Sequence, residues 1–201
     1  MMIMLASRFS GLRSLLADRR AAAAVEFAFV APVLLSLYFV TMEVAQGIEA
    51  NKKVGRVGSM VADLITQQQS INKSELNAIM SIGESILQPY NRTRPEIEVT
   101  AINITDDPNP QVLVSWSRKL SNGSTGAGAT KNTTTTVPAK LKIRNSFLIR
   151  VTSRLSYTPV IAWTADQKAN LGLAAAFDGI QMGETYYLRP RMTQTIACSD
   201  C

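Results

Sequence analysis

A long apolar stretch near the N-terminus constrains this chain more than any other feature. From Ala21 to Met42 the sequence is apolar except for Glu26 and a few small polar residues. A helix of this length extends about 33 Å, enough to cross the hydrocarbon core of a bilayer, which is about 30 Å thick. The stretch therefore predicts a single membrane-spanning helix, with most of the 201 residues on one side of it.

Charges beside the apolar stretch predict its orientation. Four arginines and one acid precede the stretch, whereas Glu43 and Glu49 follow it. Positively charged flanks are retained in the cytoplasm. We therefore predict a basic cytoplasmic leader at residues 1–21, a transmembrane helix at 22–44 and an exported domain at 45–201.

A cleavable signal peptide is an alternative for the same segment, because it also has a basic start followed by an apolar region. Signal peptides have a shorter apolar region and a small-x-small cleavage site. Ala45-Gln46-Gly47 is a passable site, although the apolar run before it is already long enough to span a membrane. Cleavage after Gly47 would release a secreted domain.

Two polar or helix-disrupting residues lie inside the predicted span. Pro32 removes one helix hydrogen bond and predicts a kink, which membrane helices tolerate. Glu26 is costly in hydrocarbon, at a few kcal/mol on insertion scales. Either Glu26 lies near the headgroups and the positive end of the helix, or it receives a positive charge from another subunit.

The residue composition removes several classes of function. The chain has no histidine, and so lacks the commonest general base and the commonest zinc ligand. Its 21 basic and 15 acidic residues are scattered, without a run of five like charges, so they do not indicate nucleic-acid binding. We expect no catalytic residue, no cofactor and no metal site.

The two cysteines, Cys198 and Cys201, stand at the end of the sequence. Their spacing occurs in redox motifs, but such motifs sit at strand-to-helix junctions. An even cysteine count in an exported domain permits a disulfide, and we expect a local one here. A free or intermolecular pair is the alternative.

Downstream of the span, hydrophobic spacing predicts helices followed by strands. Apolar residues at intervals of three and four predict that the first helix continues and packs on the protein's own sheet; they are Val54, Val57, Val61, Leu64 and Ile65. A second helix is predicted from Ser74, as its N-cap, to Gln88, with Pro89 ending it.

The remaining sequence predicts an antiparallel sheet, and hence an α+β fold. Alternating residues predict strands at 96–103, 112–117, 141–157 and 185–197, the first two joined by a turn at 106–110. The Gly-, Ser-, Thr- and Asn-rich segment 121–140 predicts a flexible, solvated loop. Residues 166–177 fit either a short helix or a packed loop.

The N-terminal stretch Ala21-Ala-Ala-Ala-Val-Glu-Phe-Ala-Phe-Val-Ala-Pro32 resembles the start of TadE-like proteins of the tight-adherence (Flp) pilus system. Shared features are a basic leader, a small residue, Ala and Val, a Glu-Phe pair, an apolar run and a proline. The resemblance implies prepilin-peptidase cleavage between Ala21 and Ala22. Glu26 and Phe27 would become the fifth and sixth residues of the mature chain. Family members usually have Gly where this chain has Ala21.

Two further segments, Arg56–Thr66 and Tyr186–Arg191, are similar to segments of the same family. The resemblance implies a pilin-like arrangement and a non-enzymatic, minor pseudopilin-like subunit of pilus assembly. It implies a bacterial inner-membrane location with a periplasmic C-terminal domain. The expected partners are the prepilin peptidase and other pilus-assembly subunits, with homo- or hetero-oligomers formed through the N-terminal helix.

The resemblance also gives Glu26 a partner. Cleavage would free an α-amino group at Ala22, which is cationic below a pKa of about 8. Glu26 of one subunit could pair with that amine on a neighbour and so fix their axial register. An unprocessed single-pass envelope protein, whose exported domain binds a partner, is the alternative.

Overall fold

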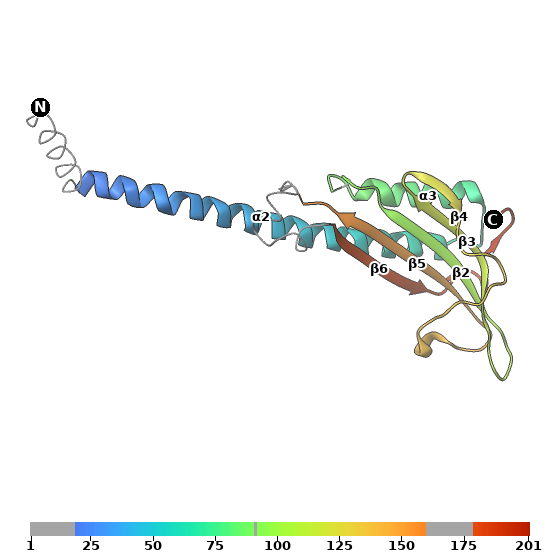
Figure 1. Cartoon of the computed structure of the whole chain (residues 1–201). Coiled ribbons are helices and arrows are strands. Elements are labelled where there is room, and N and C mark those ends of the chain that lie inside the picture. The colour runs from blue at the N-terminus through green and yellow to red at the C-terminus, as the bar shows by residue number, and fades with distance from the viewer. Residues whose placement is uncertain (1–18, 91, 160–178) are drawn as a thin grey trace, which may run out of the picture. The chain divides into compact units, whose positions relative to one another are not determined.

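A computed structural model describes residues 19–90, 92–159 and 179–201 of the chain (Figure 1). The chain divides into two compact units, residues 1–46 and 47–201. Helix α2 (Arg19–Thr66) includes the boundary between them and contains Pro32. The part of the prediction that concerns residues 166–177 falls outside the described residues.

The second unit begins with the end of α2 and continues into a short strand, β1 (Ser70–Ile71), and helix α3 (Lys73–Ile86). The N-cap of α3 is Asn72, whose side chain accepts a hydrogen bond from the Glu75 backbone, while the Glu75 side chain accepts one from the Asn72 backbone. This reciprocal pair is a capping box. Asn72, and not Ser74 as we predicted, is therefore the cap, and it lies two residues earlier in the chain.

A five-stranded antiparallel sheet follows, with the strand order β4-β3-β2-β5-β6. The strands are β2 (Glu96–Ile104), β3 (Val112–Ser121), β4 (Ser124–Ala127), β5 (Ser146–Tyr157) and β6 (Ile180–Leu188). A short 3-10 helix, η1 (Ala139–Leu141), precedes β5, and β7 (Ala197–Cys198) pairs in parallel with β1. The predicted α+β class is confirmed.

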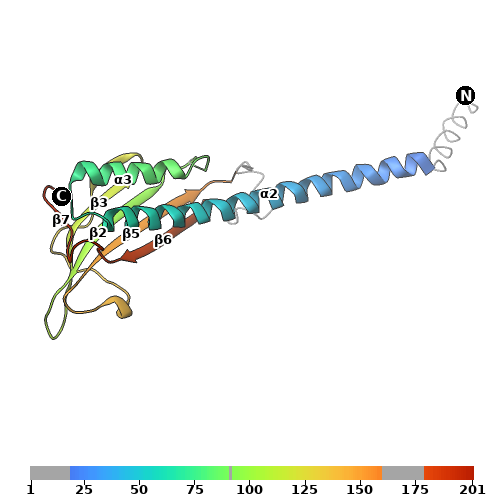
Figure 2. The ribbon, with the colours of Figure 1, turned by 180° about the vertical axis from the view of Figure 1, so that it is seen from behind.

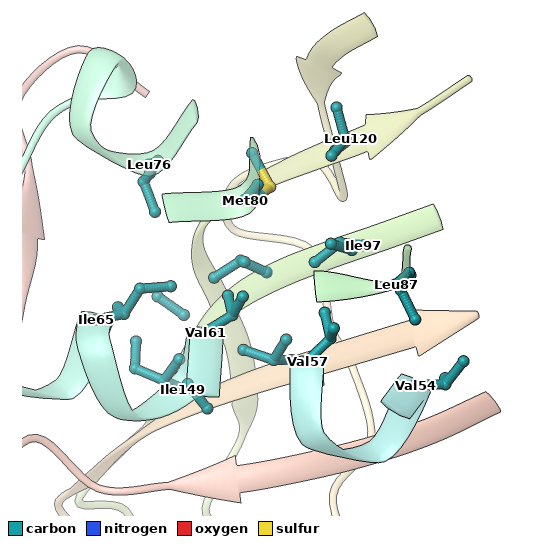
Figure 3. Packing of buried hydrophobic residues seen from close by; sticks show 14 of the residues in the cluster. Val54, Val57, Val61, Ile65, Leu76, Met80, Leu87, Ile97, Leu120 and Ile149 are labelled. Carbon is teal, nitrogen blue, oxygen red and sulfur yellow. The ribbon is translucent and has the colours of Figure 1, made fainter. Parts of the chain in front are cut away.

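The core forms between the sheet and the helices. Residues 47–66 of α2, together with α3, cover one face of the sheet, as both views show (Figures 1 and 2). Val54, Val57, Val61 and Ile65 of α2 are at most 1% exposed, so these members of the predicted stripe pack on the protein's own sheet. Leu64, the fifth member, is only partly buried and does not belong to the core cluster. Figure 3 shows these side chains beside Leu76 and Met80 of α3 and Ile97 and Ile149 of the sheet.

A β-bulge divides the sheet into two differently packed parts. The register of β2 and β3 shifts between Ala101 and Ile102. As a result Trp116 joins the core under the helices, whereas Val112 joins a second cluster on the other side. The second cluster comprises Ile102, Ile104, Val112 and Leu148. Val112, Val114 and Trp116 are all buried in the predicted strand, but the bulge places Val112 and Trp116 in different clusters.

Two further predictions differ from the structure. Within the polar segment 121–140, predicted as a loop, Ser124–Ala127 pairs with β3 as an edge strand, because backbone hydrogen bonds need no apolar side chain. The strand predicted at 185–197 ends at Leu188. Pro190 therefore follows the strand and does not lie within it.

Candidate functional site

The first unit presents an apolar helix that nothing in the described chain covers. Its side chains are exposed on every side, from Val25 at 56% through Phe27 at 72% to Val44 at 56%. None of the residues in the most apolar 18-residue window of α2 is buried. A helix that is apolar all round is normally covered by lipid or by other protein. By length and composition, α2 can cross a membrane as a single span.

Polar side chains of this helix differ in whether they have a hydrogen-bond partner. The Ser36 and Thr41 hydroxyls donate hydrogen bonds of 2.8 Å to the Val33 and Tyr38 carbonyls of the same helix. Glu26 is exposed and forms no ion pair or side-chain hydrogen bond with any residue whose side chain the structure describes. Its carboxylate is therefore available to a group from outside the described chain.

The predicted cleavage position lies in the first turn of α2, which begins at Arg19. Cleavage between Ala21 and Ala22 would leave Glu26 one helical turn from the new N-terminus. Ala22 and Phe27 are exposed. The structure therefore places Ala22, Glu26 and Phe27 on an uncovered helix.

Two segments singled out in the sequence, 56–66 and 186–191, lie against each other in the second unit. Asp63 Oδ1 of α2 lies 2.6 Å from Nη2 of Arg191, and the Arg191 backbone N–H donates to the Thr66 carbonyl at 2.9 Å. Gly58 of α2 approaches the Tyr186 ring so closely that an added Cβ would lie 2.9 Å from Cδ2. Sequence reasoning identified both segments but not this contact.

Cys198 and Cys201 form a disulfide, with their Cα atoms 5.6 Å apart. Among the described residues, these two cysteines and Asp200 form the one group of three side chains of the kinds that bind metal ions. The two sulfurs are bonded to each other, and Asp200 Oδ1 accepts a hydrogen bond of 2.8 Å from the Lys73 backbone at the start of α3. The arrangement therefore holds the end of the chain against α3, a role that sequence reasoning missed for Asp200.

Two titratable groups in the second unit have shifted pKa values. Burial raises the pKa of Glu96, but the hydrogen bonds and charges of Lys119 and Arg154 outweigh it, and the net pKa is lowered. The Tyr90 hydroxyl donates to Glu49 Oε2 at 2.7 Å, and this bond, with burial and the Glu49 charge, raises the Tyr90 pKa. Both groups join elements of the fold. Glu96 of β2 pairs with Lys119 of β3 and Arg154 of β5, and Tyr90 holds the segment after α3 against α2.

Comparison with known proteins agrees with the sequence at the N-terminus. Residues 21–62 match the family model described as TadE-like protein, which confirms the predicted resemblance over those residues. This match suggests involvement in tight-adherence (Tad) pilus assembly. No curated protein and no solved structure matches the chain significantly.

Proposed function

We propose that this chain is a minor, pseudopilin-like subunit that takes part in the assembly of a tight-adherence pilus and has no catalytic activity of its own. The match of residues 21–62 to TadE-like proteins carries this proposal. The matched segment includes the expected cleavage position, Glu26, Phe27 and the apolar helix. It also includes the first part of the stripe that packs on the sheet.

The proposed topology follows from the apolar helix and the charges beside it. Residues 1–21 form a cytoplasmic leader, residues 22–44 cross the bacterial inner membrane once, and residues 45–201 lie in the periplasm. The exposure of Val25, Phe27 and Val44 supports a membrane span. The disulfide supports an oxidising location for the C-terminal domain.

Processing and assembly are linked in this proposal through Glu26. The prepilin peptidase removes the leader between Ala21 and Ala22, and the new α-amino group of one subunit pairs with Glu26 of another. An unpaired carboxylate is costly in hydrocarbon, so the pairing favours contact between subunits. Homo- or hetero-oligomers with other pilus subunits would then form through α2.

A carboxylate-to-amide substitution tests this role. Glu26→Gln keeps the size of the side chain and removes its charge, and Glu43→Gln makes the same change further along α2. In cells with the complete pilus machinery, Glu26→Gln should reduce the co-purification of other pilus subunits at least fivefold. Glu43→Gln should leave it within twofold of wild type. Equal co-purification of the two variants would contradict the pairing.

A further inference from the structure

Two adjoining hollows lie at one end of the sheet in the second unit. Their volumes are about 310 and 320 Å³, and they share Asn103, Phe147 and Thr195. One side is formed by the ends of β2 and β5, and the other by the segment that leads from β6 to the disulfide. We call the two hollows together the amide groove. Each is at the lower end of the size range of ligand pockets, and the residues that they share make them neighbours.

The groove has two cationic side chains and no acidic side chain in its lining. Arg189 lines one hollow and Lys131 the other, and no Asp or Glu side chain lines either one. Both cations are exposed, and neither forms an ion pair with a residue in the described part of the chain. This charge favours a ligand that carries carboxylates or other anionic groups.

Free amide side chains also line the groove. Asn103, Asn145 and Gln194 line the groove and are exposed. Their side chains form no hydrogen bond with other residues that the structure describes. A side-chain amide offers both donors and an acceptor, as a peptide group does. Such groups can pair with the backbone of an extended peptide.

The aromatic residues of the groove argue against a sugar or a nucleobase. Such ligands are commonly held by stacking on an open ring face. Trp116 and Phe147 are only 5% and 6% exposed. In addition, the indole Nε1–H of Trp116 donates to the Ile196 carbonyl at 2.8 Å. Neither ring therefore offers a stacking surface.

The wall of the groove is fixed before any ligand arrives. The Trp116 bond holds Ile196, while β7 pairs with β1 through Ala197 and Cys198. Nearer β6 in the same segment, the Arg191 backbone N–H donates to the Thr66 carbonyl. A preformed site loses less conformational entropy when it binds. The groove thus suits a flexible segment that orders on binding.

We propose that the amide groove binds an extended, acidic peptide segment of a partner protein. The two cations pair with its carboxylates, and the free amides of Asn103, Asn145 and Gln194 hydrogen-bond its backbone. This inference does not rest on the proposed role in pilus assembly. Because its test uses purified protein alone, the two proposals can fail independently.

The test measures binding of fluorescent nine-residue peptides to the full chain in detergent. One peptide alternates Glu with Ser and Gly, and its control has Gln in place of each Glu. The acidic peptide should bind at least tenfold more tightly than the control. Equal binding of the two peptides would overturn the proposal. So would binding of an acidic polysaccharide together with no binding of the acidic peptide.

Substitutions then locate the binding. Arg189→Gln should weaken binding of the acidic peptide about tenfold. Lys142→Gln, which removes an exposed cation outside the groove, should change it less than twofold. Asn103→Ala leaves the charge unchanged and should weaken binding at least threefold. Near-ultraviolet circular dichroism checks that each variant is folded. An equal loss for Arg189→Gln and Lys142→Gln, or no loss for Asn103→Ala, would overturn the proposal.

Discussion

Asp63 and Arg191 are joined across the second unit, with 2.6 Å between Oδ1 of Asp63 and Nη2 of Arg191. Asp63 also accepts a hydrogen bond from the side chain of Gln67, the residue that follows α2. The contact holds the segment after β6 against the end of α2. That segment continues into one wall of the amide groove and then into the disulfide.

A double-mutant cycle should detect this pair. The Asp63 and Arg191 side chains are 38% and 57% exposed, and exposed ion pairs contribute at most about 1 kcal/mol. We expect a coupling of about 0.5–1 kcal/mol between Asp63→Asn and Arg191→Gln in urea unfolding of the detergent-solubilised chain. Strictly additive effects would show that the contact contributes no stability.

Gly58 should be intolerant of a side chain even though it lies in a helix. A Cβ at this position would lie 2.9 Å from both Ser153 Oγ and Tyr186 Cδ2. Ser153 cannot move freely, because it is buried and its hydroxyl donates to the Val54 carbonyl. Gly58→Ala should therefore lower the free energy of unfolding by about 1–3 kcal/mol.

Gly47 provides the matched control for Gly58. A Cβ added at Gly47 would have a ring carbon of Tyr157 as its nearest neighbour, at 3.8 Å, which is an ordinary van der Waals contact. Gly47→Ala should raise the stability by up to about 1 kcal/mol through helix propensity. If both substitutions stabilised the chain, the close packing of α2 on β5 and β6 would be wrong.

The ion pairs of Glu96 predict a pH-dependent contribution to stability. Glu96 Oε1 lies 3.1 Å from Lys119 Nζ and 2.8 Å from Arg154 Nη1. Its pKa is lowered on folding, so its contribution is present above the ordinary pKa and is lost as the pH falls through the folded value. Glu96→Gln should cost about 0.5–1 kcal/mol at pH 7.

The pH series separates this effect from general destabilisation. The difference in free energy of unfolding between wild type and Glu96→Gln should shrink below about pH 4. A difference that stays constant from pH 7 to pH 3 would show that the carboxylate charge of Glu96 is not its source.

Asp200 should protect the first turn of α3. Its carboxylate accepts the Lys73 N–H, and a negative charge is favourable at a helix N-terminus. Asp200→Ala should therefore speed hydrogen exchange of the Lys73 amide at least threefold. Ser199→Ala, at the exposed neighbouring position, should leave the rate unchanged, and equal acceleration by both would contradict the cap.

Local pattern was sufficient to predict much of this fold. The spacing of Val54, Val57, Val61 and Ile65 predicted the buried side of α2, and the turn at 106–110 predicted the β2–β3 hairpin. The true N-cap was also readable, because Asn72 and Glu75 have capping-box spacing. The prediction of Ser74 as the cap did not use the spacing of Asn72 and Glu75. In contrast, β4 has no apolar alternation to reveal it.

Long-range contacts could not be predicted in the same way. Asp63 and Arg191, or Trp116 and Ile196, come together only when the whole chain folds, and neither pair has a local sequence signature. The amide groove likewise combines Asn103 and Phe147 with residues from 189 onward. Its polar residues follow no sequence motif, so only their positions in the fold indicate a site.

The N-terminus of the membrane-extracted protein tests the central claim most directly. Intact mass and N-terminal sequence should be measured for protein made with and without its prepilin peptidase. We predict a chain that begins at Ala22 only when the peptidase is present. An intact leader in both samples would contradict processing as a pseudopilin and leave a plain membrane anchor, and a soluble product that begins at Ile48 would contradict the membrane span itself.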